Sequence, residues 1–357
     1  MDAMVGQGRD RRTIAVSRSL PGRENMNRVR WGILGTARIG TEKVIPAMQS
    51  CRYGEVTGIA SRNIGRAESV ARRLGIPKYF GSYEDLLADG EVDAVYIPLP
   101  NHLHVEWTIR AMEAGKHVLC EKPIALNFSE TRLLLQQKML FPDLKVMEAF
   151  MYRHHPQWIM ARKVVRDGRI GDLRTIQSFF SYFNTDPNNI RNIREAGGGG
   201  LMDIGCYSVS LSRFLFGREP LRVVGLVDRD PVFHTDRLFC GIMDFAAGTS
   251  TFTCSTQLQP FQRVVIVGNE GVVEIDTPFN SLPDRESMVR LIRKNGMELV
   301  SMPPCNQYTE QSDAFSKAIL DNIDPPFTLE DAAANMRWIE ILMKSADDKR
   351  WLSDATR

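Results

Sequence analysis

Short apolar runs alternate with segments of helical periodicity over the first half of the chain. Each apolar run is bounded by Gly, Pro or polar residues, which predicts strands over residues 29–34, 55–60, 93–97, 117–120 and 144–147. Between them, apolar side chains recur at helix spacing over residues 39–48, 66–74, 105–112 and 126–140. Apolar strands alternating with helices predict a parallel sheet covered on both faces. Right-handed crossovers then give a doubly wound Rossmann fold.

The second half of the chain is rich in strands. They are predicted over residues 175–183, 222–228, 237–245 and 249–257, with a hairpin over residues 263–275. Gly268 and Gly271 supply the turn of that hairpin. Two helices are predicted near the end, over residues 311–323 and 329–346, separated by Pro325 and Pro326. The pattern therefore predicts a second α/β domain, and the last helix is expected to pack back on the first domain.

Composition and charge restrict the classes of function. A chain of 357 residues suits two domains, and 45 Lys and Arg against 43 Asp and Glu give a formal net charge of +2. No basic run alternates with aromatic residues, which argues against nucleic acid as a partner. No stretch approaches the roughly 18 apolar residues of a membrane span, which argues against a membrane protein. The six Cys form no C-x-x-C pair, so we expect reduced thiols in a cytoplasmic protein.

Residues 1–28 differ from the rest of the chain. This segment is polar and carries six Arg against three acidic residues. It is expected to be a disordered N-terminal extension. The pair Arg11 and Arg12 raises the question of a twin-arginine export signal, but no apolar segment of the usual length follows it. We therefore expect no export.

The turn after the first predicted strand has the pattern G-x-A-x-x-G. A glycine-rich turn between a strand and a helix is the context of a dinucleotide-binding fingerprint, in which helix amides face the pyrophosphate. Ala37 stands where the usual second glycine would be, and its methyl group narrows the room for pyrophosphate without closing it. The residues expected to hold the cofactor here are Gly35, Thr36, Ala37, Arg38 and Ile39.

The end of the second predicted strand distinguishes NAD from NADP. A carboxylate there would bind the ribose 2′-hydroxyl of NAD, whereas a basic residue accommodates the 2′-phosphate of NADP. The chain has Ser61 and Arg62 at this place and no acid. A hydroxyl and a planar guanidinium suit phosphate, so the sequence favours NADP, with NAD left possible.

Four further segments carry a resemblance to a known family. They are residues 96–104 (YIPLPNHLH), 121–123 (EKP), 148–156 (EAFMYRHHP) and 197–207 (GGGGLMDIGCY). Together they resemble the glucose–fructose oxidoreductase / inositol dehydrogenase / rhizopine-catabolism (Gfo/Idh/MocA) family of NAD(P)-dependent oxidoreductases, from about residue 29 to about residue 346. Tyr207 stands where many members have His. That departure resembles the branch with glucose–fructose oxidoreductase, dihydrodiol dehydrogenase and some xylose dehydrogenases.

The resemblance implies a division of the chain into an NADP-binding Rossmann domain (29–149), a substrate and oligomerisation domain (150–327) and a C-terminal segment (328–357). The second domain is then a large, open, mostly antiparallel sheet whose open face would form a homodimer or homotetramer. The resemblance also implies that the loops after the third and fourth strands line the nicotinamide side. The residues expected there are Pro98, Leu99, Asn101, His104 and Glu121, and Arg153 is expected to anchor the cofactor or a substrate hydroxyl.

Hydride transfer at a carbinol carbon also needs a group that takes the proton from its oxygen. Lys122 follows a strand at the carboxyl edge and matches the family's EKP motif, so it is expected to bind the reacting oxygen. Asp203 and Tyr207 are four residues apart and would share one face of a helix. We expect Tyr207 to be the acid/base, with a pKa lowered by Lys122, and Asp203 to orient the pair or hold a sugar hydroxyl.

The pair His154 and His155 does not predict a metal site, because adjacent residues of a helix point apart and no partner set lies nearby. The leading hypothesis is an NADP-dependent dehydrogenase or reductase acting on a sugar or cyclic polyol. Three alternatives remain open at this point. They are a dismutase that keeps its NADP bound and exchanges hydride between two sugars, a glycosidase acting by transient oxidation, and an NADP-binding sensor without catalysis.

Overall fold

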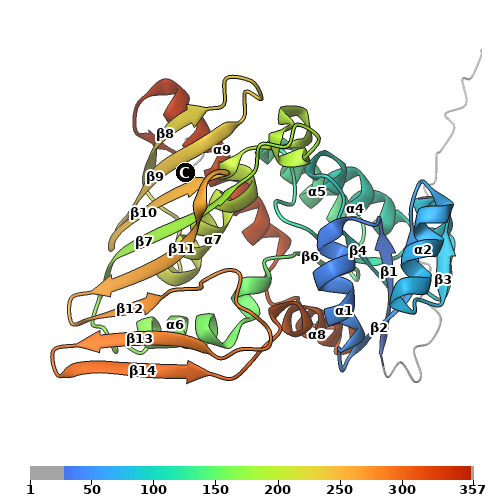
Figure 1. Cartoon of the computed structure of the whole chain (residues 1–357), viewed down its shortest axis with the longest axis horizontal. Coiled ribbons are helices and arrows are strands. Elements are labelled where there is room, and N and C mark those ends of the chain that lie inside the picture. Colours follow the sequence, from blue (N-terminus) through green and yellow to red (C-terminus); the bar gives the residue numbers. More distant parts are fainter. Residues whose placement is uncertain (1–27, 355–357) are drawn as a thin grey trace, which may run out of the picture.

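The computed structural model describes residues 28–354 and contains two sheets, each with its own helices (Figure 1). The extension predicted for residues 1–28 lies outside the described residues, apart from Arg28. Across residues 28–354, none of the helices combines the length and the apolar composition that crossing a membrane requires.

The first sheet has six parallel strands in the order β3-β2-β1-β4-β5-β6. Its strands are β1 (Val29–Leu34), β2 (Gly54–Ala60), β3 (Lys78–Phe80), β4 (Ala94–Ile97), β5 (His117–Cys120) and β6 (Val146–Glu148). The connecting helices are η1 (Gly40–Val44) with α1 (Ile45–Gln49), α2 (Ile64–Leu74), α3 (Tyr83–Ala88), η2 (Asn101–Leu103) with α4 (His104–Glu113), and α5 (Phe128–Lys138). This is the doubly wound Rossmann fold that the alternating pattern predicts.

The central strands of the first sheet consist of continuous apolar runs because they are buried on both faces. Every residue of β4 and β5 is buried, so both alternating sets of side chains meet helices. Trp31 on β1 is fully buried, packs against Phe315 of a C-terminal helix and donates from Nε1 to Ser316 Oγ at 3.1 Å. A segment almost 300 residues further along the chain thus completes one face of the first sheet.

The second sheet has nine strands in the order β14-β13-β12-β11-β7-β10-β9-β8-β15. They are β7 (Leu173–Phe183), β8 (Arg222–Arg229), β9 (Asp236–Phe245), β10 (Gly248–Ser255), β11 (Gln257–Gly268), β12 (Gly271–Ile275), β13 (Ser287–Arg293), β14 (Gly296–Met302) and β15 (Leu352–Ser353). Only the pair β7 and β10 is parallel among these strands, so the sheet is mostly antiparallel, as the resemblance implies.

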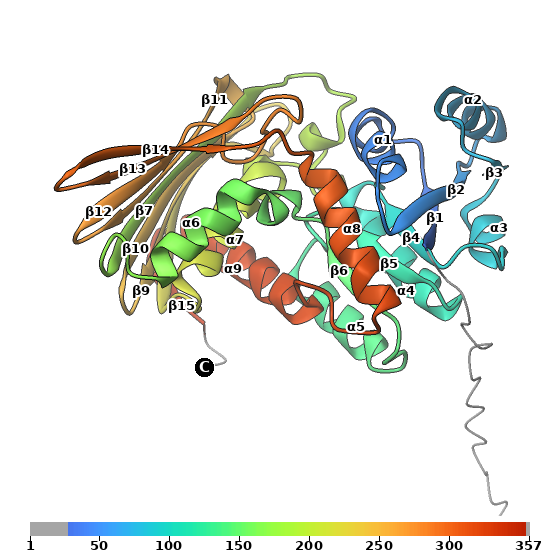
Figure 2. The same cartoon turned by 90° about the horizontal axis from the view of Figure 1, so that it is seen from below.

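Helices cover one face of the second sheet, and Figure 2 shows them on the side of the first domain. They are α6 (Pro156–Arg166), α7 (Cys206–Phe216) and α9 (Leu329–Asp348), and α8 (Gln307–Leu320) lies against the first sheet. The opposite face leaves Leu226, Ile242 and Phe261 exposed. Assembly into a dimer or tetramer through that face remains a prediction.

The last long helix joins the two halves. Helix α9 contacts β8 of the second sheet and both α5 and β6 of the first half. The Glu340 carboxylate accepts a hydrogen bond from the N–H of Phe128 at 2.8 Å, and the Arg337 guanidinium lies 4.8 Å from the centroid of the Phe128 ring. The chain therefore returns to the first domain, which fixes the two sheets relative to each other.

Candidate active site

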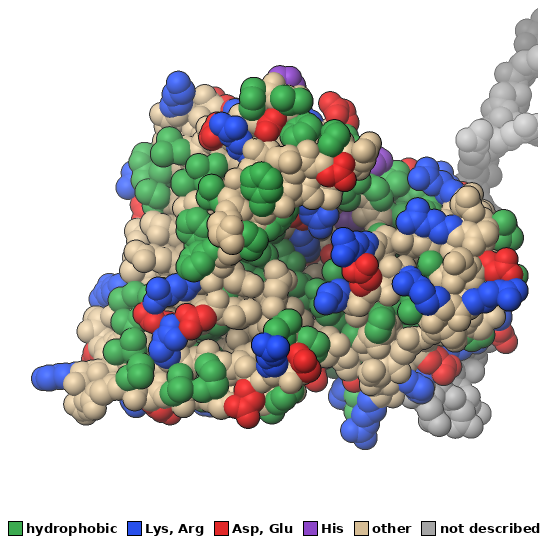
Figure 3. All heavy atoms as spheres, in the orientation of Figure 1, with side chains coloured by type: hydrophobic (Ala, Val, Ile, Leu, Met, Phe, Trp, Pro, Cys, Tyr) green, Lys and Arg blue, Asp and Glu red, His purple; other side chains and the backbone are tan. Residues whose placement is uncertain are grey.

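A cavity of about 1080 Å³ opens between the carboxyl edge of the first sheet and the helix-covered sheet. Its volume lies slightly above the roughly 300–1,000 Å³ typical of ligand pockets, so it has room for a large ligand or for two ligands side by side. Figure 3 shows Lys and Arg side chains gathered around the hollow between the two halves. The lining includes the predicted site residues Ala37, Arg38, Ile39, Pro98, Leu99, Asn101, Glu121, Lys122, Asp203 and Tyr207.

The turn after β1 has the geometry that a dinucleotide requires. Gly35 has a φ of +114°, and a Cβ built on it would lie 3.0 Å from the Leu99 side chain. No side chain caps the helix that begins with η1, so its first N–H groups and the positive end of its dipole are left for a ligand. Ala37 and Ile39 line the cavity at this point. The turn therefore fits a pyrophosphate.

Ser61 and Arg62 follow β2 outside the lining of the main cavity. Ser61 is buried and its Oγ accepts from the N–H of Asn63 at 3.3 Å, whereas Arg62 is exposed. Arg66 lies one turn further along, and its Nη2 donates to the Thr36 carbonyl at 3.5 Å. A guanidinium beside the glycine-rich turn, with another in reach and no carboxylate after β2, suits an additional phosphate on the ribose.

Buried polar groups hold the loop after β5 in place. Tyr96 donates to Glu121 Oε1 at 2.6 Å, and the Lys122 N–H donates to Glu121 Oε2 at 3.3 Å. Burial raises the pKa of Glu121. The peptide between Lys122 and Pro123 is cis. These contacts hold the backbone of Lys122 at the edge of the cavity.

His104 does not line the cavity, contrary to the expectation for the nicotinamide side. It is the first residue of α4 and is fully buried, because that end of the helix faces the core. Its Nδ1 lies 2.7 Å from the Pro123 carbonyl and its Nε2 lies 2.7 Å from the Leu99 carbonyl. Burial lowers the pKa of His104 to about 4. The buried ring therefore lies between the loop that carries Leu99 and the loop that carries Lys122, on the side away from the cavity.

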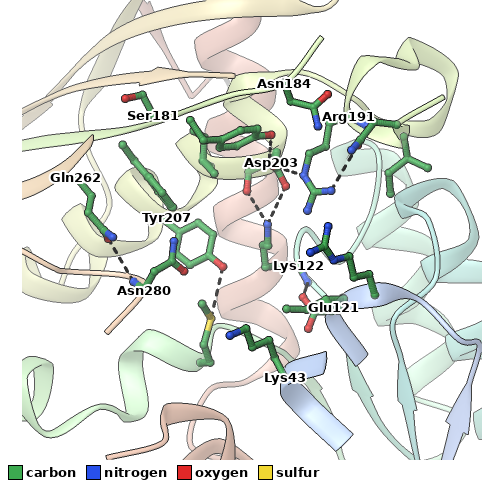
Figure 4. A pocket seen from close by; sticks show the side chains of 18 of the residues that line it. Lys43, Glu121, Lys122, Ser181, Asn184, Arg191, Asp203, Tyr207, Gln262 and Asn280 are labelled. Carbon is green, nitrogen blue, oxygen red and sulfur yellow. Dashed lines mark hydrogen bonds and ion pairs between the residues drawn. The ribbon is translucent and has the colours of Figure 1, made fainter. Parts of the chain in front are cut away.

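Asp203 is the centre of a charged cluster at the cavity wall (Figure 4). Lys122 Nζ donates to the Asp203 carbonyl at 2.6 Å and to its Oδ1 at 3.2 Å. The other carboxylate oxygen, Oδ2, accepts from Tyr182 Oη at 2.6 Å and from Arg191 Nε at 2.9 Å. Burial opposes ionisation, but the two cations outweigh it and lower the pKa of Asp203. Burial also opposes the charge of Lys122, and Asp203 outweighs it and raises the pKa of Lys122.

Asp203 and Tyr207 do not lie on one regular α-helix. Residues Leu201–Gly205 form the π-helical turn η6, and α7 begins at Cys206. Asp236 accepts from the Leu201 N–H at 2.6 Å, and a Cβ on Gly199 would lie 1.9 Å from the same carboxylate, so the glycine run leaves room for this cap. The wider turn still brings both Asp203 and Tyr207 to the cavity.

The environment of Tyr207 differs from the one expected. Its hydroxyl donates to Met151 Sδ at 3.4 Å, and its ring packs edge-on against Phe150 and Phe180. Burial raises the pKa of Tyr207 well above its usual value, so the lowering expected from Lys122 is not found. The physical reason is that the Lys122 ammonium lies over the ring face and donates to Asp203.

Arg153 does not reach the cavity and is not placed to anchor a cofactor there. It is buried, its Nη1 forms an ion pair with Asp331 of α9, and its Nε donates to Ser210 Oγ at 3.0 Å. The guanidinium also lies 4.6 Å from the centroid of the Phe327 ring. Arg153 therefore connects η3 (Met151–His154) with α7 and α9.

Several lining residues were not found from the sequence as site residues. Tyr182 on β7, Tyr308 on α8 and Lys43 on η1 each line the cavity. Tyr182 could have been noticed because it follows Phe180 by two residues and so lies on the same face of its strand. Tyr308 and Lys43 carry no comparable signal. Asn184 and Arg191, on the polar loop that follows β7, also line the cavity.

Comparison with protein families gives two matches. The model described as "Oxidoreductase family, NAD-binding Rossmann fold" (GFO_IDH_MocA) matches residues 29–138. The model of the GFO/IDH/MocA C-terminal domain matches residues 158–274. The two matches cover most of the chain and correspond to the two halves of the fold.

Individual proteins and structures are also similar to the chain. An uncharacterized oxidoreductase, ORF334, of Rhizobium meliloti is 42% identical over 91% of this chain and 99% of its own length. D-xylose 1-dehydrogenase (NADP(+)) 2 of Haloferax volcanii is 35% identical over 89% of this chain and 97% of its own. The crystal structure of KijD10, a 3-ketoreductase from Actinomadura kijaniata in complex with NADP and TDP-benzene, has 28% identity and a TM-score of 0.84, covering 89% of this chain and 98% of that one.

Proposed function

The chain belongs to the Gfo/Idh/MocA oxidoreductase family, and from that premise we propose that it is an NADP-dependent oxidoreductase of sugars or cyclic polyols. In the proposed reaction a hydride passes between nicotinamide C4 and a carbinol or carbonyl carbon. Tyr207 is the acid/base and Lys122 assists it. The relatives named as a xylose dehydrogenase and a ketoreductase support this class of reaction.

One observation carries the proposal. Lys122, Asp203 and Tyr207, which lie on two different halves of the chain, line one cavity together with the uncapped turn at Ala37. Binding of a dinucleotide needs the turn but none of the other three residues. A phenol can exchange a proton with a carbinol oxygen, and a lysine ammonium that a carboxylate holds in place can stabilise negative charge on it.

The residues of the chain act on the oxygen of the substrate. A bound nicotinamide supplies or accepts the hydride. Lys122 donates a hydrogen bond to the reacting oxygen and stabilises the negative charge that develops on it. Tyr207, whose pKa burial raises, is protonated at neutral pH and donates its phenolic proton to that oxygen during reduction, which leaves a phenolate. In the direction of oxidation, that phenolate would be the form that accepts the proton. Asp203 keeps Lys122 charged and in place.

The preference for NADP is part of the proposal. Arg62, with Arg66 in reach of the same place, would contact the 2′-phosphate, and the NADP named for two of the relatives supports this choice. Titration of the protein with NADPH and NADH, followed by Trp fluorescence, tests it. Tighter binding of NADPH by tenfold, about 1.4 kcal/mol, is expected. Equal binding of the two nucleotides would refute the assignment of Arg62.

Turnover tests the reaction itself. Purified protein is supplied with NADP⁺ and a panel of aldoses and polyols, and with NADPH and the corresponding keto-sugars, while nicotinamide absorbance is followed. We expect turnover in the wild type and its loss in Tyr207→Phe, with nucleotide affinity retained. Equal absence of turnover in both proteins on every substrate, with NADPH still bound, would instead indicate a sensor.

A further inference from the structure

The Asp203 carboxylate accepts hydrogen bonds from three side chains, although one would be enough to hold Lys122 in place. Lys122 occupies Oδ1, while Tyr182 and Arg191 share Oδ2. Both oxygens are therefore engaged within the protein, and a substrate hydroxyl would have to compete with three donors for them. This arrangement makes Asp203 a positioning residue and directs attention to the donor that it holds at the cavity wall.

The Nε edge of the Arg191 guanidinium is bound by Asp203, and its other edge, which we call the outer edge, faces the cavity. The Arg191 carbonyl accepts from the Gly199 N–H at 2.9 Å, which fixes the backbone, and its Nε is bound to Asp203. Nη1 lies 3.5 Å from Asn189 Oδ1, a weak contact. Nη2 has no hydrogen-bond partner among residues 28–354, and the side chain is 40% exposed at the lining of the cavity.

The charges of the cluster do not cancel. Lys122 and Arg191 contribute two positive charges, and Asp203 contributes one negative charge. Among these three side chains, Lys122 alone would neutralise Asp203. Glu121 is a further carboxyl in the lining, but its oxygens accept from Tyr96 and from the Lys122 N–H and not from Arg191. A guanidinium has planar donors on several edges, so one edge can bind Asp203 while another binds a ligand.

We propose that Arg191 is a specificity-determining residue of this site, which donates from its outer edge to a substrate oxygen other than the one that reacts. This assignment rests on the proposed function and deepens it: the substrate is a polyhydroxylated molecule whose second oxygen atom Arg191 recognises. Asn184, on the same loop and also in the lining, stands beside Arg191 in Figure 4. Tyr182 and Asp203 set the angle at which the guanidinium meets the cavity.

The experiment measures equilibrium binding of sugars to the protein loaded with NADPH, which cannot accept a hydride from the sugar, so that oxidation of the sugar does not disturb the titration. D-xylose, D-glucose and their singly deoxygenated analogues are titrated into wild type and into Arg191→Met and Arg191→Lys. The control is Arg194→Met, an exposed arginine three residues along that does not line the cavity. NADPH affinity is measured for each variant in parallel.

In the wild type, loss of one particular hydroxyl should weaken binding by about tenfold or more, because a charged donor that the bound sugar covers is left without its acceptor. In Arg191→Met that position should no longer matter, while NADPH affinity stays within twofold. Arg191→Lys should restore part of the discrimination at most, because Lys lacks the second edge. Arg194→Met should behave as the wild type.

Two results would overturn the assignment in different ways. Equal losses for every deoxy analogue in wild type and Arg191→Met would refute the role of Arg191 and leave the proposed function intact. Absence of sugar binding by the wild type, with NADPH bound normally, would refute the proposed substrate class and this assignment together.

Discussion

The ammonium of Lys122 lies over the face of the Tyr207 ring, 5.0 Å from the ring centroid. Its hydrogen bonds go to Asp203. Lys122 therefore attracts the electrons of the ring but does not contact the phenol oxygen, and burial keeps Tyr207 protonated. A substrate oxygen that enters between the two side chains would receive a donor from each, which suits reduction of a carbonyl.

Replacement of Lys122 by Met should abolish most of the turnover and leave the fold intact. Removal of one preorganised donor commonly lowers kcat by about 10²–10³-fold. Asp203 keeps Tyr182 and Arg191 as partners, so the carboxylate is not left unpaired in the variant. Steady-state kinetics and NADPH titration measure the two effects. Unchanged kcat in Lys122→Met would show that the lysine has no part in the chemistry.

Tyr207→Phe separates the phenol from the packing of its ring. The ring contacts Phe150, Phe180 and Phe279, and these contacts survive in the variant. The hydroxyl has one weak protein acceptor, Met151 Sδ, so the unfolding free energy should change by less than about 1 kcal/mol. Turnover should fall by about 10²–10⁴-fold. Denaturant unfolding and kinetics are the measurements, and retained turnover would exclude Tyr207 as the acid/base.

Arg153→Met should destabilise the protein without weakening NADPH binding. The variant removes one of the two cations that pair with Asp331, and Arg213 remains as the other. Because Arg213 still pairs with Asp331, which is partly exposed, the loss should be about 1–3 kcal/mol, the range for a hydrogen bond between charged groups. Urea unfolding should show the loss, while the NADPH dissociation constant stays the same. A variant with normal stability and weak NADPH binding would restore the cofactor-anchoring role first expected of Arg153.

Glu148 should make stability depend on pH. Burial raises its pKa to about 8, while Glu148 Oε1 accepts from the Ile124 N–H at 2.8 Å. In the unfolded chain a glutamate has a pKa of about 4.3. Between that pH and 8, the folded state therefore holds a proton on Glu148 that the unfolded chain has lost. The unfolding free energy should fall as pH rises between about 4.5 and 8, by about 1 kcal/mol per pH unit.

Glu148→Gln tests this directly, since the amide oxygen can still accept from Ile124. As pH rises from 5 to 8, the wild type should lose unfolding free energy steadily relative to Glu148→Gln. Glu195→Gln, at an exposed position, serves as the matched control and should show no such trend. Parallel curves for wild type and Glu148→Gln would mean that Glu148 is ionised in the folded protein throughout.

Local pattern predicted the elements that are long or buried on both faces. The runs that became β1, β4 and β5 could be identified because a central parallel strand needs apolar residues on both sides. The three-residue strand β3 and the edge hairpin of β13 and β14 were missed. β3 is too short to show a period, and β14 is exposed along most of its length, so neither required an apolar run.

The sequence by itself determined the glycine-rich turn and the EKP loop, because each is a local motif with a fixed place at the end of a strand. The resemblance to a known family, rather than any local pattern, predicted that Lys122, Asp203 and Tyr207 act together. Only the tertiary structure decided the partners of these residues. Arg153 meets Asp331 across 178 positions, and Lys122 meets Asp203 across 81. Burial and partner choice at such separations depend on how the two sheets pack, and no local pattern records them.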